Sequence, residues 1–301
     1  MKLDPTKAKR TRLQDANLRE DRDDPKRVYL LEWGEEDTGK RKAKGEKECA
    51  RKVEILFAEM TEETEKRFEF LADTFEFLSE NGVSVPSVEE RIKTEKELRL
   101  IVSYEGEGLA DQLKDGRELD LSQVAEIFRG ISKIEEAKSE FVPPRPLRKF
   151  FEKLEAEDVK IDPALKEPLG DLKVKLRNFL DEFGADYNYG WGVIDPDIIN
   201  FTVDKEGKIS LIDIDGLRKT YDYYYQAGYF WVSLERLKKA SLVKTCREEF
   251  AEALDFSRPN AEKRFRLGKL GALSIGVFHN LRTPEEAFGR IEKIQKLLKI
   301  N

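Results

Sequence analysis

Residues 193–216 read VIDPDIINFTVDKEGKISLIDIDG, and this stretch decides the fold. Two short apolar runs, 198–203 and 209–214, flank a polar turn that contains Gly207. Apolar and β-branched residues on both sides of a glycine-containing turn are typical of a β-hairpin. The pattern therefore predicts an antiparallel hairpin whose outer ends carry carboxylates.

Three oxygen-bearing side chains lie at these outer ends: Asp195, Asn200 and Asp213. Asn200 begins the first strand and Asp213 lies near the end of the second, so strand pairing brings them to one edge, with Asp195 in the loop beside them. Carboxylate and amide oxygens suit Mg²⁺ that also binds phosphates. Phosphoryl transfer needs such a cluster, because metal ions neutralise the phosphates while a separate carboxylate orients the attacking hydroxyl.

The Asp195-x4-Asn200 spacing and the IDID sequence at 212–215 resemble the catalytic loop and metal-binding motif of the protein-kinase-like superfamily. The nearest members are the aminoglycoside and small-molecule phosphotransferases. The order of elements is similar too, with a strand, a helix, a Gly-Val-x-Val-Pro turn at 82–86, further strands, a hinge and a helical part. The similarity covers about residues 28 to 235.

This resemblance implies a two-lobed α+β fold. The N-terminal lobe, residues 1–104, is expected to hold a reduced antiparallel sheet and one long helix. The C-terminal lobe, residues 105–301, is expected to be helical and to carry the catalytic hairpin. ATP and Mg²⁺ would bind between the lobes, with the backbone of Ser103, Tyr104 and Glu105 facing the adenine.

The same resemblance assigns roles to the hairpin residues. Asp195 is the expected base or orienter of the acceptor hydroxyl, and Asn200 and Asp213 are the expected metal ligands. Asp215 either holds a second metal or supports the loop, and Asp222 anchors the loop. The implied function is phosphoryl transfer from ATP to a hydroxyl of an unidentified, small-molecule acceptor.

Departures from the family pattern keep an alternative open. The strand lysine is expected within 28–33, where Glu32 stands, no glycine-rich loop precedes residue 28, and Val193-Ile194 replaces the usual histidine. The helix glutamate that partners this lysine is Glu46, Glu48 or Glu54. The alternative function is a pseudokinase-type nucleotide-binding or regulatory module without turnover, which would dock a protein partner.

Periodicity and end signals predict the remaining elements. A helical 3–4 spacing runs from Cys49 to Leu78, with a break at which Thr61 caps a second helix and a stop at Asn81-Gly82. Other predicted elements are strands at 28–33, 88–92 and 98–104 and helices at 109–138, 165–183, 234–256 and 284–300.

The amino-acid composition excludes several classes of protein and of functional site. The chain has 301 residues, and its 55 Lys and Arg and 61 Asp and Glu give a net charge of −6, which does not favour a nucleic-acid binder. Two cysteines and one histidine exclude a disulfide framework and a Cys/His metal site, and they do not favour Ser-His-Asp chemistry. Without an apolar leader or a run that spans a bilayer, we expect a cytoplasmic protein without a membrane partner.

Two further stretches have competing interpretations. GEEDTGKR at 34–41 nearly matches a phosphate-binding P-loop, but Arg41 stands where a Ser or Thr is required, and three acids would repel phosphates. A plain turn that leads into a helix is the favoured interpretation. The aromatic segment 221–231 is predicted to pack in the core of the helical lobe rather than to stack on a base or sugar.

Overall fold

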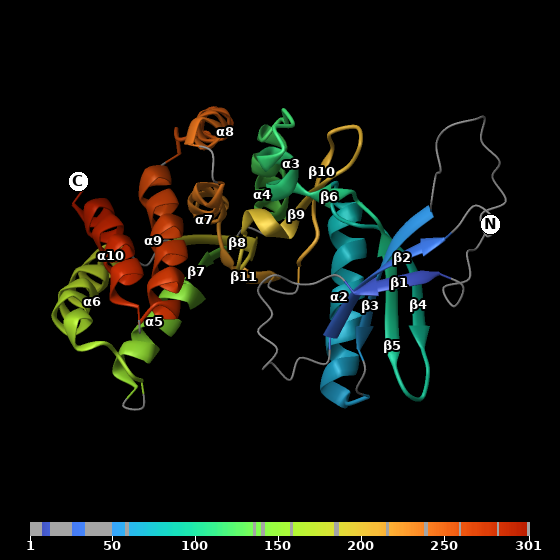
Figure 1. The fold of residues 1–301 in the computed structure, drawn as a ribbon, viewed down its shortest axis with the longest axis horizontal. Coiled ribbons are helices and arrows are strands. Elements are labelled where there is room, and N and C mark those ends of the chain that lie inside the picture. Colours follow the sequence, from blue (N-terminus) through green and yellow to red (C-terminus); the bar gives the residue numbers. More distant parts are fainter. Residues whose placement is uncertain are drawn as a thin grey trace. The chain divides into compact units, whose positions relative to one another are not determined.

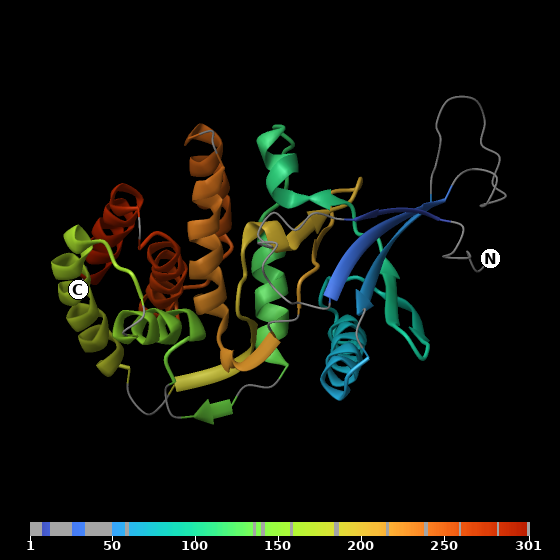
Figure 2. The ribbon, with the colours of Figure 1, turned by 60° about the horizontal axis from the view of Figure 1, so that its bottom comes forward.

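The computed structural model describes residues 8–12, 26–33, 50–57, 60–134, 137–139, 142–156, 159–183, 187–214, 217–237, 240–258, 260–281 and 283–299. The chain divides into an N-terminal unit, Met1–Gly106, and a C-terminal unit, Glu107–Asn301. Figure 1 and Figure 2 show the elements of each unit from two sides.

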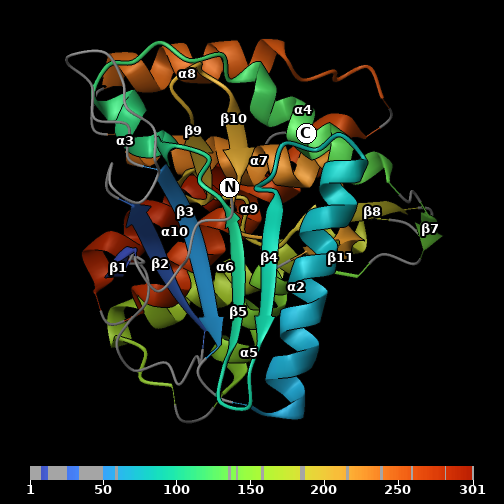
Figure 3. The same ribbon diagram turned by 90° about the vertical axis from the view of Figure 1, so that its right-hand side faces the viewer.

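The N-terminal unit contains an antiparallel sheet of five strands in the order β1-β2-β3-β5-β4. Figure 3 shows β5 between β3 and β4. Strands β2, β4 and β5 confirm the strands predicted near 28–33, 88–92 and 98–104. The bounds are β1 Lys9–Arg12, β2 Lys26–Trp33, β3 Ala50–Phe57, β4 Val88–Lys93 and β5 Leu98–Ser103.

Strand β3 shows that the helical interpretation of residues 49–57 is wrong. This segment pairs with β2 on one side and β5 on the other, so it is the central strand of the sheet. Ile55, Leu56 and Phe57 are all buried. A strand that is covered on both faces needs no alternation of apolar and polar residues, and its apolar run then resembles a helical pattern.

The long helix of this unit, α2 (Glu62–Glu80), has the predicted end signals. Thr61 forms a capping box with Thr64, in which each side chain accepts a hydrogen bond from the other residue's backbone N–H. Asn81 follows the helix, and Gly82 adopts φ +75°, which a glycine accommodates without strain. The buried face of α2 includes Phe68, whose ring centroid lies 6.0 Å from that of Phe57 in β3.

The capping box predicts a measurable loss of stability. The Thr61→Ala substitution leaves first-turn N–H groups of α2 without their side-chain acceptor, so we expect the free energy of unfolding to fall by about 1 kcal/mol in chemical denaturation. Ser79→Ala, at an exposed site in the last turn of the same helix, is the matched control and should stay within about 0.5 kcal/mol of wild type. Equal losses in both variants would exclude a special role for the cap.

The C-terminal unit combines two small sheets with a set of helices. The sheets have the orders β10-β9-β6 and β11-β8-β7, and Figure 2 shows β8 between β7 and β11. Helices α6 and α10 confirm predicted helical segments. The segment 109–138, predicted to be helical throughout, is divided into α3 and α4 and reaches strand β7, and the segment 234–256 contains η4 and α8. The bounds are β6 Glu107–Gly108, α3 Leu109–Lys114, α4 Ser122–Lys133, β7 Ala137–Ser139, α5 Arg145–Glu155, η2 Pro163–Leu165, α6 Lys166–Asp181, β8 Tyr187–Val193, η3 Ile198–Asn200, β9 Phe201–Val203, β10 Ile209–Leu211, β11 Leu217–Tyr221, α7 Tyr223–Ser233, η4 Leu234–Arg236, α8 Ala240–Glu252, α9 Ala261–His279 and α10 Pro284–Leu298.

Helices α5, α6, α7, α9 and α10 share an apolar core. Helices α7 and α9 cross so closely that a Cβ atom on Gly228 would lie 1.9 Å from the carbonyl oxygen of Phe265, and one on Gly268 would lie 2.0 Å from that of Tyr225. Tyr225 and Phe230 are fully buried, which confirms that the aromatic segment packs in the core. Within the described ranges, no helix has the length and apolar character needed to cross a bilayer.

Candidate catalytic hairpin

Strands β9 and β10 form the predicted hairpin, but Asn200 does not begin its first strand: Ile198–Asn200 forms the 3₁₀ helix η3, and β9 begins at Phe201. Its register pairs Phe201 with Leu211 and Val203 with Ile209, so each strand contributes three residues. The turn closes through the Asp204 carboxylate, which accepts from the backbone N–H groups of residues 206 and 208 at 2.9 Å. Gly207 takes φ +89° in this turn, a conformation that L-residues with a side chain rarely adopt.

Aromatic packing fixes the hairpin on the helices. The ring of Phe201 is fully buried, and its centroid lies 5.8 Å from that of Phe128 in α4 and 5.4 Å from that of Phe230 in α7. Both contacts are edge-to-face, the arrangement that aromatic quadrupoles favour. Strand β9 is therefore anchored from two helices.

Two polar side chains hold the closed end of the hairpin. Gln123 of α4 accepts from the N–H of Ile209 and donates to the carbonyl oxygen of Gly207, both at 3.0 Å. Arg117 donates to the carbonyl oxygens of Asp204 and Lys205 at 2.8 and 3.0 Å. These bonds hold the turn at the closed end in place. The position of the open end then depends on how the two strands pack.

The open end brings together the segments of three predicted site residues. The N–H of Ile212, next to Asp213, donates to the carbonyl oxygen of Asn200 at 2.9 Å. The side-chain Nδ2 of Asn200 donates to the carbonyl oxygen of Asp195 at 2.8 Å. This second bond engages the amide nitrogen of Asn200 and leaves its amide oxygen as the atom suited to a cation.

A second strand pair closes the other side of these loops. Val193 at the end of β8 is paired with Leu217 at the start of β11, so residues 194–200 and 212–214 lie between two strand ladders. The Asp195 side chain is exposed and that of Asp213 is half-buried, while Asp215 lies outside the described residues. Among the described residues, no group of three or more His, Cys, Asp and Glu side chains is placed to hold a metal ion. The expected ligands are a different group, because they include the Asn200 amide and Asp215.

Helix α7 contacts the Asp195 loop with two polar side chains that sequence reasoning missed. The Gln226 carbonyl accepts from the N–H of Val193 at 3.0 Å, and the Ser233 hydroxyl accepts from the N–H of Ile198 at 3.0 Å. The spacing 226, 233 places both on one face of the helix, which also holds Tyr229, a residue whose pKa is raised by burial and by the charge of Asp195. Polar residues at this spacing in an aromatic segment are the signal that could have found them.

Asp222, the expected loop anchor, caps the start of α7. Its carboxylate accepts from the backbone N–H of Tyr225 at 2.7 Å, and the Arg264 Nε of α9 lies 3.7 Å from it. A carboxylate at a helix N-terminus satisfies an otherwise unpaired N–H and interacts favourably with the helix dipole. Asp222 therefore helps to place the helix that carries Gln226, Tyr229 and Ser233.

The expected adenine contacts lie at the end of β5, in the N-terminal unit. The Ser103 hydroxyl accepts from the N–H of Ser87 at 2.8 Å and hydrogen-bonds to the Glu105 carboxylate. The guanidinium of Arg51 lies 5.5 Å from the ring centroid of Tyr104. Two residues after Glu105, the chain enters β6, where Glu107 pairs with Val203 of the hairpin.

The family lysine is expected within 28–33, on β2, whereas the strand that directly precedes α2 is β3. Protein kinases carry that lysine on the third strand, ahead of the helix that supplies its glutamate partner. Here β3 contains Lys52, which forms an ion pair with Glu89 at the start of β4. Glu32, on β2, instead pairs with Arg51, with 3.1 Å between the Nε and Oε1 atoms.

Glu54 is not the helix partner of a lysine, because it lies in β3. It is buried and forms ion pairs with Arg10 of β1 and with Arg99 of β5, the latter at 3.7 Å. The other two candidates, Glu46 and Glu48, lie outside the described residues, as does the P-loop-like stretch 34–41. The first described element after that stretch is strand β3, not the expected helix.

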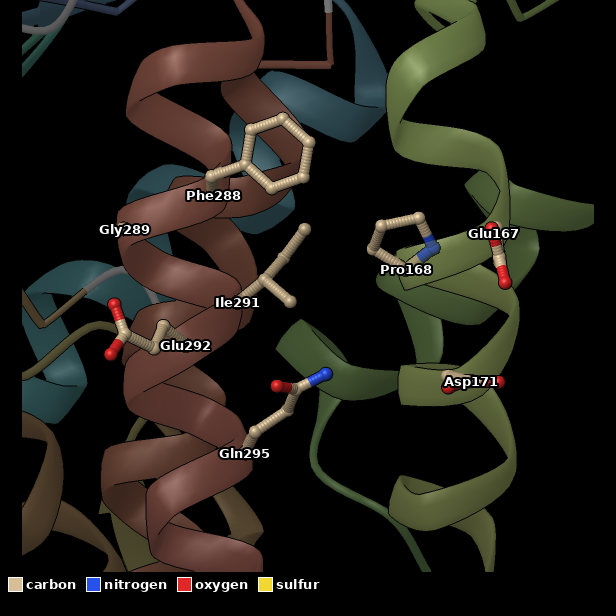
Figure 4. Close-up of a pocket in the computed structure, with 8 residues that line it drawn as sticks. All are labelled: Glu167, Pro168, Asp171, Phe288, Gly289, Ile291, Glu292 and Gln295. Atoms are coloured by element: carbon tan, nitrogen blue, oxygen red, sulfur yellow. The ribbon is translucent and has the colours of Figure 1, made fainter.

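A separate groove of about 460 Å³ lies between α6 and α10. Figure 4 shows Phe288 and Ile291 of α10 facing Pro168 of α6, with Glu167 and Asp171 along the α6 side. None of the predicted site residues lines this groove. In Figure 1, α9 and α7 stand between α10 and the hairpin sheet, so the groove is distinct from the hairpin site.

No family model matches this chain, and no curated protein matches its sequence. Solved structures do match its fold. The similar structures include a choline/ethanolamine kinase family protein from Mesorhizobium loti, with TM-score 0.58 and 13% identity over 97% of this chain and 88% of that chain.

Two aminoglycoside phosphotransferases are similar as well. One is APH(2″)-IIa in a ternary complex with streptomycin and ATP, with TM-score 0.56 and 12% identity over 96% of this chain and 91% of that chain. The other is APH(3″)-Id from Streptomyces rimosus, with TM-score 0.50 and 14% identity over 87% of this chain and 92% of that chain. The predicted fold class, a protein-kinase-like α+β fold, is thereby confirmed.

Proposed function

We propose that this protein is a phosphotransferase that moves the terminal phosphoryl group of ATP to a hydroxyl of a small-molecule acceptor. One observation carries the proposal: two hydrogen bonds at the open end of the hairpin link the segments of Asp195, Asn200 and Asp213. A fold shared with kinases, one of them bound to ATP and streptomycin, supports the same chemistry.

The donor set at the hairpin end fits a magnesium ion. The amide oxygen of Asn200 and the carboxylate of Asp213 are hard oxygen ligands, and Mg²⁺ usually takes one or two such ligands together with water and phosphate oxygens. Asp215 is the further candidate ligand. When bound, the ion neutralises charge on the phosphates.

Asp195 is the proposed base. Its exposed carboxylate would accept a hydrogen bond from the acceptor hydroxyl and orient the oxygen towards phosphorus. As the bond from this oxygen to phosphorus forms, the bond to the bridging oxygen of ADP breaks, and the hydroxyl proton passes to Asp195 and then to solvent. Most of the rate gain would come from positioning and charge stabilisation.

The nucleotide contacts are assigned to the N-terminal unit. The backbone of Ser103, Tyr104 and Glu105 is proposed to hydrogen-bond the adenine. Lys52 is proposed to hold the phosphates, because it lies on the strand ahead of α2, where protein kinases carry their phosphate-binding lysine. Its ion pair with Glu89 would then exchange for the nucleotide.

The alternative is a nucleotide-binding or regulatory module that does not turn ATP over and docks a protein partner. One observation favours it: residues 13–25, between β1 and β2, contain no glycine. Kinases close a glycine-rich loop over the phosphates there, because glycine lets backbone N–H groups approach closely. Val193 and Ile194 in place of a histidine point the same way.

A thermal-shift titration combined with an ADP-release assay separates the two functions. We expect ATP with Mg²⁺ to raise the melting temperature, with about 2.7 kcal/mol of stabilisation at a ligand concentration of about 100 times Kd, and EDTA to reverse the effect. Mg²⁺-dependent ADP release, stimulated by one compound of a panel of amino sugars and amino alcohols, supports the phosphotransferase. Stabilisation without release across this panel supports the regulatory module, and no shift contradicts both.

A further inference from the structure

We infer that Gln226 and Ser233 of α7 are positioning residues for Asp195, because they hold the two ends of the loop that presents its carboxylate. Each side chain accepts a hydrogen bond from a backbone N–H of this loop, one before Asp195 and one after it. The inference rests on the proposed function, in which Asp195 is the base, and it adds two residues that the resemblance to kinases does not assign.

The two hydrogen bonds lie on either side of Asp195. The side-chain carbonyl of Gln226 accepts from the N–H of Val193 at 3.0 Å. The hydroxyl of Ser233 accepts from the N–H of Ile198 at 3.0 Å. The two acceptors are two turns of α7 apart, about 10 Å along the helix axis. One rigid helix therefore fixes the backbone of the loop at both of its ends.

Both acceptors are buried and have a fixed orientation. Gln226 is 0% exposed and Ser233 is 2% exposed. The amide nitrogen of Gln226 donates to the Ser132 hydroxyl of α4 at 3.1 Å and to the carbonyl oxygen of Asp222 at 3.3 Å, so its carbonyl is the group that faces the loop. The Ser233 hydroxyl donates to the carbonyl oxygen of Phe230 at 2.7 Å, so its oxygen serves the loop as an acceptor.

The helix that carries these acceptors is itself held in place. Gly228 and Gly268 let the backbones of α7 and α9 approach closely, so α7 has no room to shift towards α9. In the middle of the loop, the carbonyl oxygen of Asp195 accepts from the Asn200 side chain at 2.8 Å. With its backbone held at both ends and in the middle, Asp195 reorients only by rotation of its own side chain. A base that is held in this way needs little reorganisation to meet an acceptor hydroxyl.

The first test observes the two hydrogen bonds without any need for turnover. Amide hydrogen exchange followed by NMR reports each loop N–H separately. We expect Ser233→Ala to speed the exchange of Ile198 about tenfold and to leave Val193 unchanged, because only one acceptor is lost. Gln226→Met, which approximately keeps the side-chain volume, should give the reverse pattern. An unchanged Ile198 rate in Ser233→Ala, or equal acceleration of both amides in both variants, would overturn the inference.

The second test measures the effect on rate. We expect Ser233→Ala to lower kcat for ADP release about tenfold and to keep KM for ATP within about twofold of wild type, because a small displacement of the base slows the chemical step. Ser274→Ala is the matched control. Ser274 is also buried, in α9, and within the described part of the chain its hydroxyl has no hydrogen-bond partner. This variant should retain both kcat and the exchange rate of Ile198.

A double variant separates positioning from a general loss of structure. In the Asp195→Ala background, Ser233→Ala should cost no further turnover, because the group that it positions is absent. Unchanged kcat in Ser233→Ala, the same loss in Ser274→Ala, or a further loss in the double variant contradicts the positioning role. If the wild-type protein releases no ADP, the phosphotransferase proposal fails, and amide exchange alone then decides whether Gln226 and Ser233 hold the loop.

Discussion

Replacing Asp213 with Asn is expected to reduce Mg²⁺-dependent ATP turnover by about a thousandfold, because a bound metal contributes several kcal/mol of charge stabilisation in the transition state. Asn keeps the size of the side chain but removes the negative charge that would hold the cation. Asp213 directly follows the last hydrogen bond of the hairpin, so the strands themselves should not be disturbed. ADP release at saturating ATP, with and without Mg²⁺, measures the loss.

The matched control is Glu206→Gln. It removes one charge from the same hairpin, but at the exposed turn, opposite the proposed metal site. We expect turnover and the Mg²⁺-dependent thermal shift to be unchanged in this variant. Undiminished turnover in Asp213→Asn, or the same loss in both variants, would remove Asp213 from the proposed site.

The second large effect concerns stability. A methyl group on Gly228 would lie 1.9 Å from the carbonyl oxygen of Phe265, far inside van der Waals contact, and the obstacle is backbone that no side-chain rotation can clear. Helices α7 and α9 must then separate, which opens the core they share. We expect Gly228→Ala to lower the free energy of unfolding by about 3 kcal/mol, measured by chemical denaturation followed by circular dichroism.

Two other helical glycines provide controls in which alanine is expected to raise, not lower, the free energy of unfolding. Gly170 in α6 and Gly289 in α10 are exposed, and an added methyl group would meet no neighbouring atom within 4 Å at either position. Alanine is favoured over glycine in a helix interior by about 0.8–1 kcal/mol, so both substitutions should stabilise the protein. A stabilising Gly228→Ala would mean that the helices do not touch at this crossing.

Local signals predicted many of the elements correctly. Helix α2 starts after Thr61 and stops at Asn81 and Gly82 because these residues satisfy its terminal backbone groups or reverse the chain, and neither effect needs distant contacts. The hairpin is equally local, since a short turn, residues 204–208, joins its two strands. Once the hairpin forms, pairing places Asn200 beside Ile212, the residue before Asp213.

Strand β3 could not be predicted from its own residues. Its three consecutive buried residues, Ile55, Leu56 and Phe57, are covered by distant parts of the chain, among them α2. Phe57 contacts Phe68 of α2, while Glu54 pairs with Arg10 and Arg99. Because residues 49–57 are interpreted as helical, the sequence places the expected lysine strand at β2, whereas Lys52, the proposed phosphate contact, lies on β3.

Neighbouring residues alone specify the hairpin, the spacing of Asp195, Asn200 and Asp213 on it, and the ends of α2, because turns, caps and short strand pairs involve side chains only a few positions apart. Other features arise only when the chain has folded: Ala50–Phe57 becomes a strand, Gly228 and Gly268 lie at a helix crossing, and Gln226 and Ser233 reach the Asp195 loop from α7. These features depend on which surfaces cover one another, and burial by distant segments overrides local preference.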